Sequence, residues 1–385
     1  MSHLFKTIFC SAVLMLLTAA GARADGTPVG VELPRQFISV ADYKGNANQR
    51  IKAAMADAAK TKHKTVFFPN GTYALRDAVS LNLGPRTEIH LIGESRDGVQ
   101  LIPDIPYLEA NFRGGKGERL IGMINLDSHS VFNYVNVSIQ NMTLNMKSQA
   151  VHLKPRTYNV IGHGVRVGQG WRRGKFKVNH VTIKNIGGYG IGVQDRGGHP
   201  KSNITLTNLH IERTGSDGID TKEASGNGNR NLIIRDVTVK DIGYTDGGYA
   251  SALDIRYRDV IIERVNLSSA AKVKTPTGKT TNNGGITFRP NGGVLRAKVS
   301  EVYINGFSSA ISVQSTDGIA HRNIAISDFK IEGYSNSGIR IWGPKNTGHR
   351  VSDGYVHSKR GKALIYDQKD VTVRNVTKGP WPDEK

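Results

Sequence analysis

Five charged residues recur at matching places in a short repeated segment. The copies read Asp-Gly-Ile-Asp-Thr-Lys from residue 217, Ser-Ala-Leu-Asp-Ile-Arg from residue 251 and Gly-Gly-Ile-Thr-Phe-Arg from residue 284. Asp220 and Asp254 share one position of the segment. Two residues later, a second position holds Lys222, Arg256 and Arg289. If consecutive copies stack as neighbouring strands about 4.8 Å apart, these side chains form one compact charged patch.

Such a patch suits the removal of a proton that lies beside a carboxylate. Elimination across a 4-linked uronic acid removes the C5 proton, and the adjacent carboxylate must first be neutralised by a cation or a Lewis-acid metal. Asp220 and Asp254 could share a Ca²⁺ ion, which prefers several oxygen ligands. Lys222 or Arg256 would then be the catalytic base, with its proton affinity lowered by the metal and the neighbouring cations.

The elements that must position these residues are repeats of two kinds. The first kind has two short apolar-alternating stretches joined by one polar residue, at Asn141, His180, Asn208, Asp236, Arg264, Asp328 and Asn375. Alternation at period two predicts strands, and Asn and Asp tolerate a left-handed backbone between them. The second kind, which includes the charged segment, begins at residues 163, 189, 217, 251, 284, 309, 337 and 362.

The spacing of the repeats indicates the fold class. Most copies of the second kind are 25 to 28 residues apart, which leaves room for three short strands and turns but for no helix. Blades of a β-propeller need about 40 to 50 residues, so this period is too short for them. Coils of this kind cannot bury their apolar faces alone and must stack. We therefore predict an all-β chain that forms a right-handed parallel β-helix, a solenoid.

Strand alternation then sorts the side chains of the second repeat by face. The expected inward columns are Val165, Ile191, Ile219, Leu253, Ile286, Ile311, Ile339 and Leu364, and Val167, Val193, Thr221, Ile255, Phe288, Val313 and Ile341. The first outward column contains Arg166, Gly192, Asp220, Asp254, Thr287, Ser312 and Arg340. The second contains Gly168, Gln194, Lys222, Arg256, Arg289, Gln314 and Trp342. From this face we expect substrate to be bound by Arg289, Arg166, Asp217, Arg340 and Trp342.

The connections around the charged patch are the longest between copies. The spacing rises to 34 residues from 217 to 251 and to 33 residues from 251 to 284. Long loops over one stretch of a rigid scaffold are frequent sites of function. This supports the assignment of the patch as an active or binding groove.

The N-terminal end of the repeats fits a cap. Residues 46–59 (NANQRIKAAMADAA) are Ala-rich and amphipathic, and they place Ile51, Ala54, Met55 and Ala58 on one face. A helix across the open end of a solenoid blocks edge pairing. The flanking segments are FISVADY from residue 37, TVFFPNGTY from residue 65 and LIGESRDG from residue 91. Together with them, this stretch resembles the N-terminal start of the β-helix in the pectate lyase-like superfamily.

The resemblance covers nearly all of the mature chain and implies a β-helix that acts on carbohydrate. The superfamily contains polysaccharide lyases, polygalacturonase-type hydrolases, uronan epimerases and phage tailspikes, so the resemblance specifies the fold better than the activity. The layout of Asp220 and Asp254 beside Lys222 and Arg256 is similar to that of its calcium-dependent lyases, whose base is a Lys or an Arg. This similarity rests on the positions of the four residues in the outward columns and not on a sequence motif. The entry departs from the common pattern at Lys44–Asn48, where an Asp-Thr-rich stretch is usual.

Glycoside hydrolysis is a different reaction that part of the sequence favours. The run TGSDGID from residue 214 resembles the polygalacturonase Asn-Thr-Asp-Gly element at Asp217 and Gly218. The paired aspartates expected one coil later are replaced by Ala and Ser, and the one Gly-His-Gly element, around His163, precedes Asp217 instead of following it. A C5-epimerase, or a non-catalytic protein that binds or guides an exopolysaccharide, is also compatible with these residues.

Composition and the N-terminus indicate where the protein works. His3 and Lys6 precede a short apolar run from Thr7 to Ala20 that ends at Ala-Arg-Ala, which predicts a signal peptide cleaved after Ala24. The run is shorter than the roughly 20 residues of a membrane span. We expect an exported, periplasmic or secreted protein with no membrane anchor. We expect three segments: a signal peptide over residues 1–24, an N-terminal segment with the capping helix over residues 25–64, and a parallel β-helix over residues 65–385.

The charge of the chain points to an anionic partner. Lys and Arg number 52 against 32 Asp and Glu, for a formal net charge of +20, which favours polyanions. The sequence has no groove-reading motif or aromatic stacking platform for nucleic acid. We therefore predict an exported monomer that acts on an acidic polysaccharide, most directly as a lyase.

Overall fold

The computed structural model describes residues 36–62, 64–83, 86–107, 122–128, 134–147, 162–168, 173–193, 202–221, 230–245, 248–276, 278–289, 294, 296–316, 320–366 and 370–379. The chain divides at Arg35, and everything described here belongs to the unit Gln36–Lys385. The expected signal peptide, together with Lys222 and Gln194, lies outside the described residues. None of the described helices is long and apolar enough to cross a membrane.

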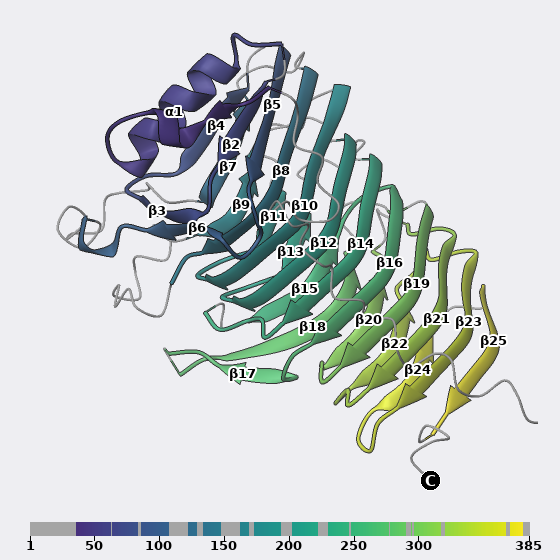
Figure 1. Cartoon of the computed structure of the whole chain (residues 1–385). Coiled ribbons are helices and arrows are strands. Elements are labelled where there is room, and N and C mark those ends of the chain that lie inside the picture. Colours follow the sequence, from purple (N-terminus) through teal and green to yellow (C-terminus); the bar gives the residue numbers. More distant parts are fainter. Residues whose placement is uncertain are drawn as a thin grey trace, which may run out of the picture. The chain divides into compact units, whose positions relative to one another are not determined.

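Two parallel sheets run the length of this unit, one strand of each per coil (Figure 1). The longer sheet follows the order β1 (Ile38–Ser39), β2 (Thr65–Phe68), β5 (Arg86–Gly93), β8 (Tyr134–Asn145), β10 (Arg173–Ile186), β12 (Ser202–Thr214), β14 (Arg230–Lys240), β16 (Asp259–Ser268), β19 (Arg296–Asn305), β21 (Ile324–Glu332), β23 (His349–His357) and β25 (Val371–Lys378). The strands β3 (Gly71–Leu75) and β6 (Val99–Pro103) pair at its side.

The second sheet holds the charged segment. Its order is β4 (Val79–Leu83), β7 (Gly122–Ser128), β9 (His163–Val167), β11 (Ile191–Val193), β13 (Ile219–Thr221), β15 (Tyr249–Ile255), β18 (Thr280–Phe288), β20 (Ser309–Gln314), β22 (Ser337–Trp342) and β24 (Lys362–Tyr366). Neighbouring strands on this path pair in parallel, as a right-handed β-helix requires. The predicted fold class is confirmed.

The register confirms the predicted inward column. Val165, Ile191, Ile219, Leu253, Ile286, Ile311, Ile339 and Leu364 are direct partners along consecutive strands. All but Leu364 are buried, and Leu364 packs against the core from the last described strand of the sheet. This column and the apolar residues of the longer sheet form one continuous core.

The polar joining residues bend the strands of the longer sheet. Asn141, Asn208 and Asp236 have φ angles of 54°, 52° and 56°, and the same left-handed conformation recurs at the equivalent place in the other coils. The two predicted short strands are therefore one long, bent strand in each coil. Asn and Asp are suited to this place because their short side chains tolerate the left-handed region.

The predicted cap is helix α1 (Ala47–Ala58), preceded by the short 3-10 helix η1 (Val40–Asp42). The Asn46 side chain accepts a hydrogen bond from Gln49 N, and the Gln49 side chain accepts one from Asn46 N, which makes a capping box. Ile51, Ala54 and Ala58 are buried, and Met55 is partly buried against the same core. The helix thus packs on the first coil as the sequence indicates (Figure 1).

The second long connection is more ordered than a loop. The strand β17 (Lys272–Lys274) pairs antiparallel with the start of β18 and makes a hairpin that projects from the second sheet (Figure 1). Its turn closes with a hydrogen bond from Thr275 N to Lys279 O of 2.8 Å. The hairpin extends β18 toward Tyr249, whose backbone is the direct register partner of Asn282.

Candidate functional site

Three carboxylates converge on the outer side of the second sheet. Asp220 and Asp254 are direct partners on β13 and β15, and Asp217 lies two residues before β13 begins. One oxygen atom from each of the three lies within 4.8 Å of the others. The backbone N–H of Ser251 donates to Asp217 Oδ1 at 2.5 Å, which fixes Asp217 against the next coil.

Two guanidinium groups neutralise most of this charge. Arg256 Nη2 donates to Asp254 Oδ2 at 3.2 Å, and its Nη1 lies 3.6 Å from Asp220 Oδ1. Arg289 Nε donates to Asp254 Oδ2 at 2.9 Å. The Asp254 carboxylate therefore holds two of the three cations that the sequence places in the second outward column, Arg256 and Arg289.

A threonine in the inward column braces this arrangement. Val or Ile fills the equivalent place in most other coils, whereas β13 has Thr221. The Thr221 hydroxyl donates to Asp254 O at 2.9 Å and accepts from Arg256 N at 2.9 Å. Both bonds reach the next coil and fix the backbone on either side of Ile255. They thereby hold Asp254 and Arg256 so that their side chains contact each other.

Three charged side chains of the first predicted outward column are buried in the structure. Asp220 is 0 % exposed, Asp254 2 % and Arg166 5 %. Tyrosine side chains lie against two glycines near this site, Gly192 in the column and Gly284 outside it. A Cβ on Gly192 would lie 3.2 Å from the Tyr189 ring, and one on Gly284 would lie 2.4 Å from the Tyr249 hydroxyl oxygen.

The exposed part of the site is cationic and aromatic. The Arg289 side chain is 27 % exposed, and its guanidinium lies over the ring of Tyr249 at 4.7 Å from the centroid. Tyr249 is itself 36 % exposed. Burial lowers the pKa of Arg289, but the Asp254 carboxylate outweighs burial and raises the pKa above its ordinary value. Arg289 is therefore a permanent positive charge at the surface.

The other predicted binding residues lie further along the same sheet. Arg166 is separated from Asp220 by Gly192, and Arg340 is separated from Asp254 by Thr287 and Ser312. At about 4.8 Å per strand these separations are roughly 10 Å and 14 Å. The Arg340 guanidinium stacks on the Trp342 ring at 4.5 Å. Asp217, Asp220, Asp254, Arg256 and Arg289 thus form one cluster, and Arg166, Arg340 and Trp342 flank it.

The three carboxylates fit a divalent cation in their chemistry. Ca²⁺ takes carboxylate oxygens as hard ligands, and Asp217, Asp220 and Asp254 offer three such groups within reach of one ion. Arg256 and Arg289 offset part of the charge of these carboxylates. A bound ion would share Asp254 with both guanidiniums.

The family of the chain follows from comparison with known proteins. The model of the family described as rhamnogalacturonase A/epimerase, pectate lyase-like, matches residues 35–241, more than half of the 385 residues. The chain belongs to this family. This confirms the resemblance to pectate lyase-like, carbohydrate-active proteins that the sequence indicates. No curated protein sequence matches the chain.

Comparison with solved structures concerns the fold alone, and only a TM-score of at least 0.50 supports it. The catalytic unit of a GH87 α-1,3-glucanase from Streptomyces thermodiastaticus superposes with a TM-score of 0.50 at 11% identity, over 92% of this chain and 71% of that one. The A-module of the mannuronan C-5 epimerase AlgE6 from Azotobacter vinelandii matches with a TM-score of 0.47 at 12% identity, over 90% and 100%. At such identities the likeness is one of fold.

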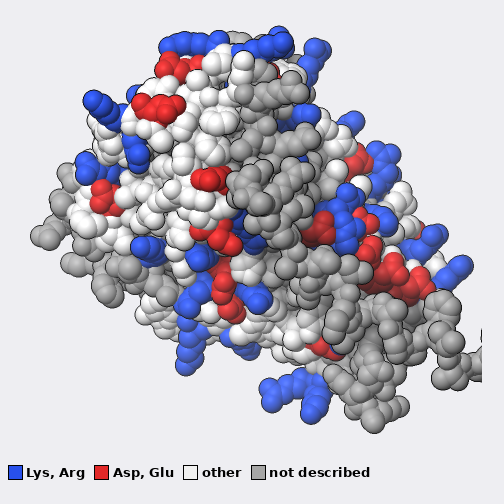
Figure 2. Space-filling view, viewed as in Figure 1, with Lys and Arg blue, Asp and Glu red and all other residues white. Residues whose placement is uncertain are grey.

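Sequence reasoning about this pectate lyase-like chain missed the tyrosines. Tyr189 and Tyr249 lie outside the two predicted columns, and Tyr189 stacks on His163 with ring centroids 4.6 Å apart. A signal was present for Tyr189, because the position that its ring covers, Gly192, is a glycine in a column of larger polar residues. On the face that Figure 2 shows, Lys and Arg are interspersed with Asp and Glu and do not form a single basic patch. Local clusters of charged residues are therefore a better guide to ligand binding than the net charge of the chain.

Proposed function

We propose that the chain cleaves an acidic polysaccharide that contains uronic acids, by β-elimination. The observation that carries the proposal is the convergence of Asp217, Asp220 and Asp254 with two guanidiniums beneath an exposed Arg289 and Tyr249. A surface that is cationic and aromatic suits an anionic sugar. The carboxylates beneath it are too buried to contact a sugar directly, so their role is to hold cations.

In this mechanism the substrate carboxylate binds at the Arg289 guanidinium, and the sugar ring lies near Tyr249. Asp217, Asp220 and Asp254 would hold Ca²⁺, which when bound supplies a Lewis acid for the same carboxylate. The base takes the C5 proton, the C5–H electron pair forms the C4–C5 double bond, and the C4–O4 bond breaks with its electrons on oxygen. The leaving oxygen is then protonated. The products are an unsaturated uronate and a new reducing end.

The contacts of Arg256 favour Lys222 as the base. Arg256 is buried and lies against two carboxylates, so its positive charge holds the cluster together. Lys222 follows Thr221 directly at the end of β13, in the segment that carries Asp217 and Asp220. An ammonium beside bound cations loses its proton more readily than a free one. We propose Lys222 as the base and Arg256 as the residue that positions Asp220 and Asp254.

Incubation with a panel of acidic polysaccharides tests this proposal. We expect ultraviolet absorbance from the new double bond, loss of that signal with a chelator, and recovery with Ca²⁺. Lys222→Ala should abolish the signal, whereas Lys274→Ala, an exposed lysine of the β17 hairpin, should keep it. New reducing ends without absorbance, formed in the presence of chelator, would instead identify a hydrolase. Inversion at C5 without cleavage would identify an epimerase.

A further inference from the structure

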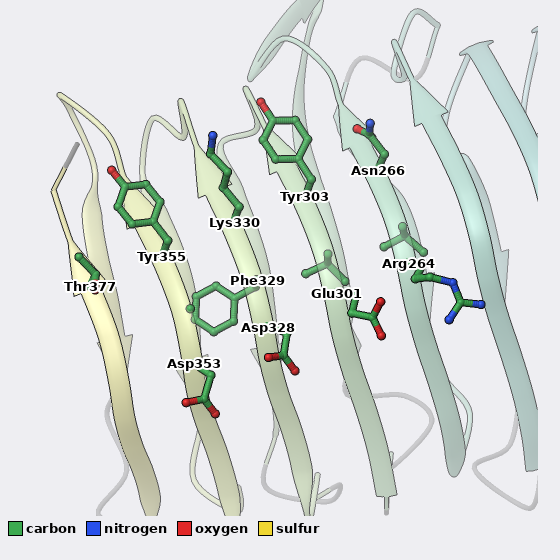
Figure 3. Close-up of a pocket in the computed structure, with 13 residues that line it drawn as sticks. Arg264, Asn266, Glu301, Tyr303, Asp328, Phe329, Lys330, Asp353, Tyr355 and Thr377 are labelled. Carbon is green, nitrogen blue, oxygen red and sulfur yellow. The ribbon is translucent and has the colours of Figure 1, made fainter. Parts of the chain in front are cut away.

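A groove of about 680 Å³ crosses the longer sheet, on strands that the proposed lyase mechanism does not use (Figure 3). It runs along the solenoid over β16, β19, β21, β23 and β25, where each strand bends at its left-handed residue. Five strands at about 4.8 Å span roughly 19 Å along the axis. A groove of that length and direction suits an extended chain.

One wall of the groove is acidic. Glu301, Asp328 and Asp353 occupy equivalent places on consecutive strands, and all three side chains are exposed (Figure 3). Among the described residues, none forms an ion pair with these three carboxylates. This differs from the neighbouring coils, where Arg264 pairs with Asp236 and Arg235 pairs with Glu263, both at 2.7 Å.

The opposite wall is polar and close to neutral. Tyr303 and Tyr355 line this wall from β19 and β23, and their rings project away from the acidic wall (Figure 3). The hydroxyl of Tyr303 donates to Glu332 at 3.0 Å. Lys330 lies between the two tyrosines along the wall, and its ammonium is 2.9 Å from the Glu332 carboxylate, which offsets its charge. Tyr355 is 3 % exposed. An occupant therefore meets a polar wall that is close to neutral on one side and negative charge on the other.

The floor between the walls is apolar. It consists of Val265, Val302 and Phe329, which are direct partners on consecutive strands. Gly354 is the next residue in this row. A Cβ on Gly354 would lie 2.2 Å from the Phe329 ring, so the glycine allows the ring to lie across β23. The ring closes the space that the glycine leaves, and the floor stays continuous.

We propose that this groove binds a saccharide chain that carries free amino groups. The row of carboxylates complements ammonium groups spaced along a polymer, and an apolar floor between two polar walls suits sugar rings. An acidic polysaccharide is disfavoured here because its carboxylates would meet Glu301, Asp328 and Asp353. The groove and the Arg289 cluster therefore select opposite charges on two different sheets of one solenoid.

Titration with a hexamer of 1,4-linked glucosamine tests the assignment on the full chain. We expect Asp328→Asn/Asp353→Asn to weaken binding about tenfold. Asparagine suits the left-handed backbone at both places, so this variant should fold. Asp241→Asn, at another left-handed position outside the groove, should bind like the unchanged protein. Elimination activity should be the same in all three.

Competition between ligands identifies the chemical group that the groove recognises. The N-acetylated hexamer should bind at least about tenfold more weakly than the amino form, and an oligouronate of equal length should not compete. Equal binding of the N-acetylated form, unchanged affinity in the double variant, or tighter binding of an oligolysine would each overturn the proposal. Because none of these readouts uses cleavage, they are independent of the lyase assignment.

Discussion

Asp254 and Arg289, on adjacent coils, are joined by a 2.9 Å hydrogen bond from Nε to Oδ2 that links a buried carboxylate to a surface cation. Arg256 donates to the same carboxylate oxygen through Nη2. The position of Arg289 at the surface therefore depends on Asp254. Asp220, by comparison, has its contact with Arg256 at 3.6 Å.

This asymmetry predicts different costs for two matched substitutions. Asp254→Asn should lower the free energy of unfolding by about 3 kcal/mol, because it leaves two guanidiniums without their shared partner in a largely buried site. Asp220→Asn should cost clearly less, since Arg256 keeps Asp254 and one like-charge repulsion disappears. Urea denaturation of both variants measures the difference. Equal losses of unfolding free energy would show that Asp220 and Asp254 stabilise the guanidiniums equally.

A second prediction concerns acid stability. Burial lowers the pKa of His321 and of His349 to about 4. Both rings are fixed by backbone contacts, since each Nδ1 accepts a hydrogen bond, His321 from Val294 N at 3.1 Å and His349 from Ile324 N at 3.3 Å. Both stay neutral in the folded state while the unfolded chain takes up protons near pH 6.5.

The sign of the effect follows from these depressed values. Stability is fully present above about pH 6.5 and falls as the pH drops toward 4, by up to about 3 kcal/mol for each histidine. Denaturation at a series of pH values measures this, and His321→Gln should flatten the dependence by about half. A stability that is flat between pH 7 and pH 4 would contradict burial of the two neutral rings.

A third prediction tests the packing of the groove floor. Gly354→Ala should destabilise the protein by about 2 kcal/mol because the new methyl group collides with the Phe329 ring. Gly248→Ala is the matched control, since its Cβ would meet no heavy atom within 4 Å. The combination Gly354→Ala/Phe329→Leu should recover part of the loss. Additive losses in the double variant would show that the ring and the glycine are not coupled.

A fourth prediction separates binding from chemistry on the second sheet. Arg340 lies three strands from Asp254, and its guanidinium stacks on Trp342. Arg340→Ala should raise KM for an acidic polymer about fivefold with kcat unchanged, and the effect should shrink as salt rises. An equal fall in kcat would place Arg340 at the reacting sugar instead.

The sequence predicts the fold because each coil repeats the same local rules. Alternation fixes which side of a strand is buried, and a left-handed residue such as Asn141 or Asp236 marks each bend. The capping helix is equally local, since Asn46 and Gln49 satisfy each other within one turn. Register then follows, because a slip by one residue would expose the column that contains Ile219.

The candidate site is predicted less completely, because its surroundings come from several coils. Strand alternation finds Asp220 and Asp254 as neighbours but treats an outward residue as solvated. In the structure they are buried, and they contact Arg256 of one coil and Arg289 of the next. The groove floor is a similar case, since Phe329 and Gly354 belong to different repeats. Such contacts appear only when the register of neighbouring coils is known.

The absorbance of the reaction products tests the lyase account most directly. The unchanged protein is incubated with polyuronates, with Ca²⁺ and with chelator, beside Lys222→Ala and the Lys274→Ala control. We predict a rise in ultraviolet absorbance with Ca²⁺ that is absent in chelator and in Lys222→Ala but kept in Lys274→Ala. Cleavage that proceeds in chelator to a saturated product, or an unchanged rate in Lys222→Ala, would contradict the account.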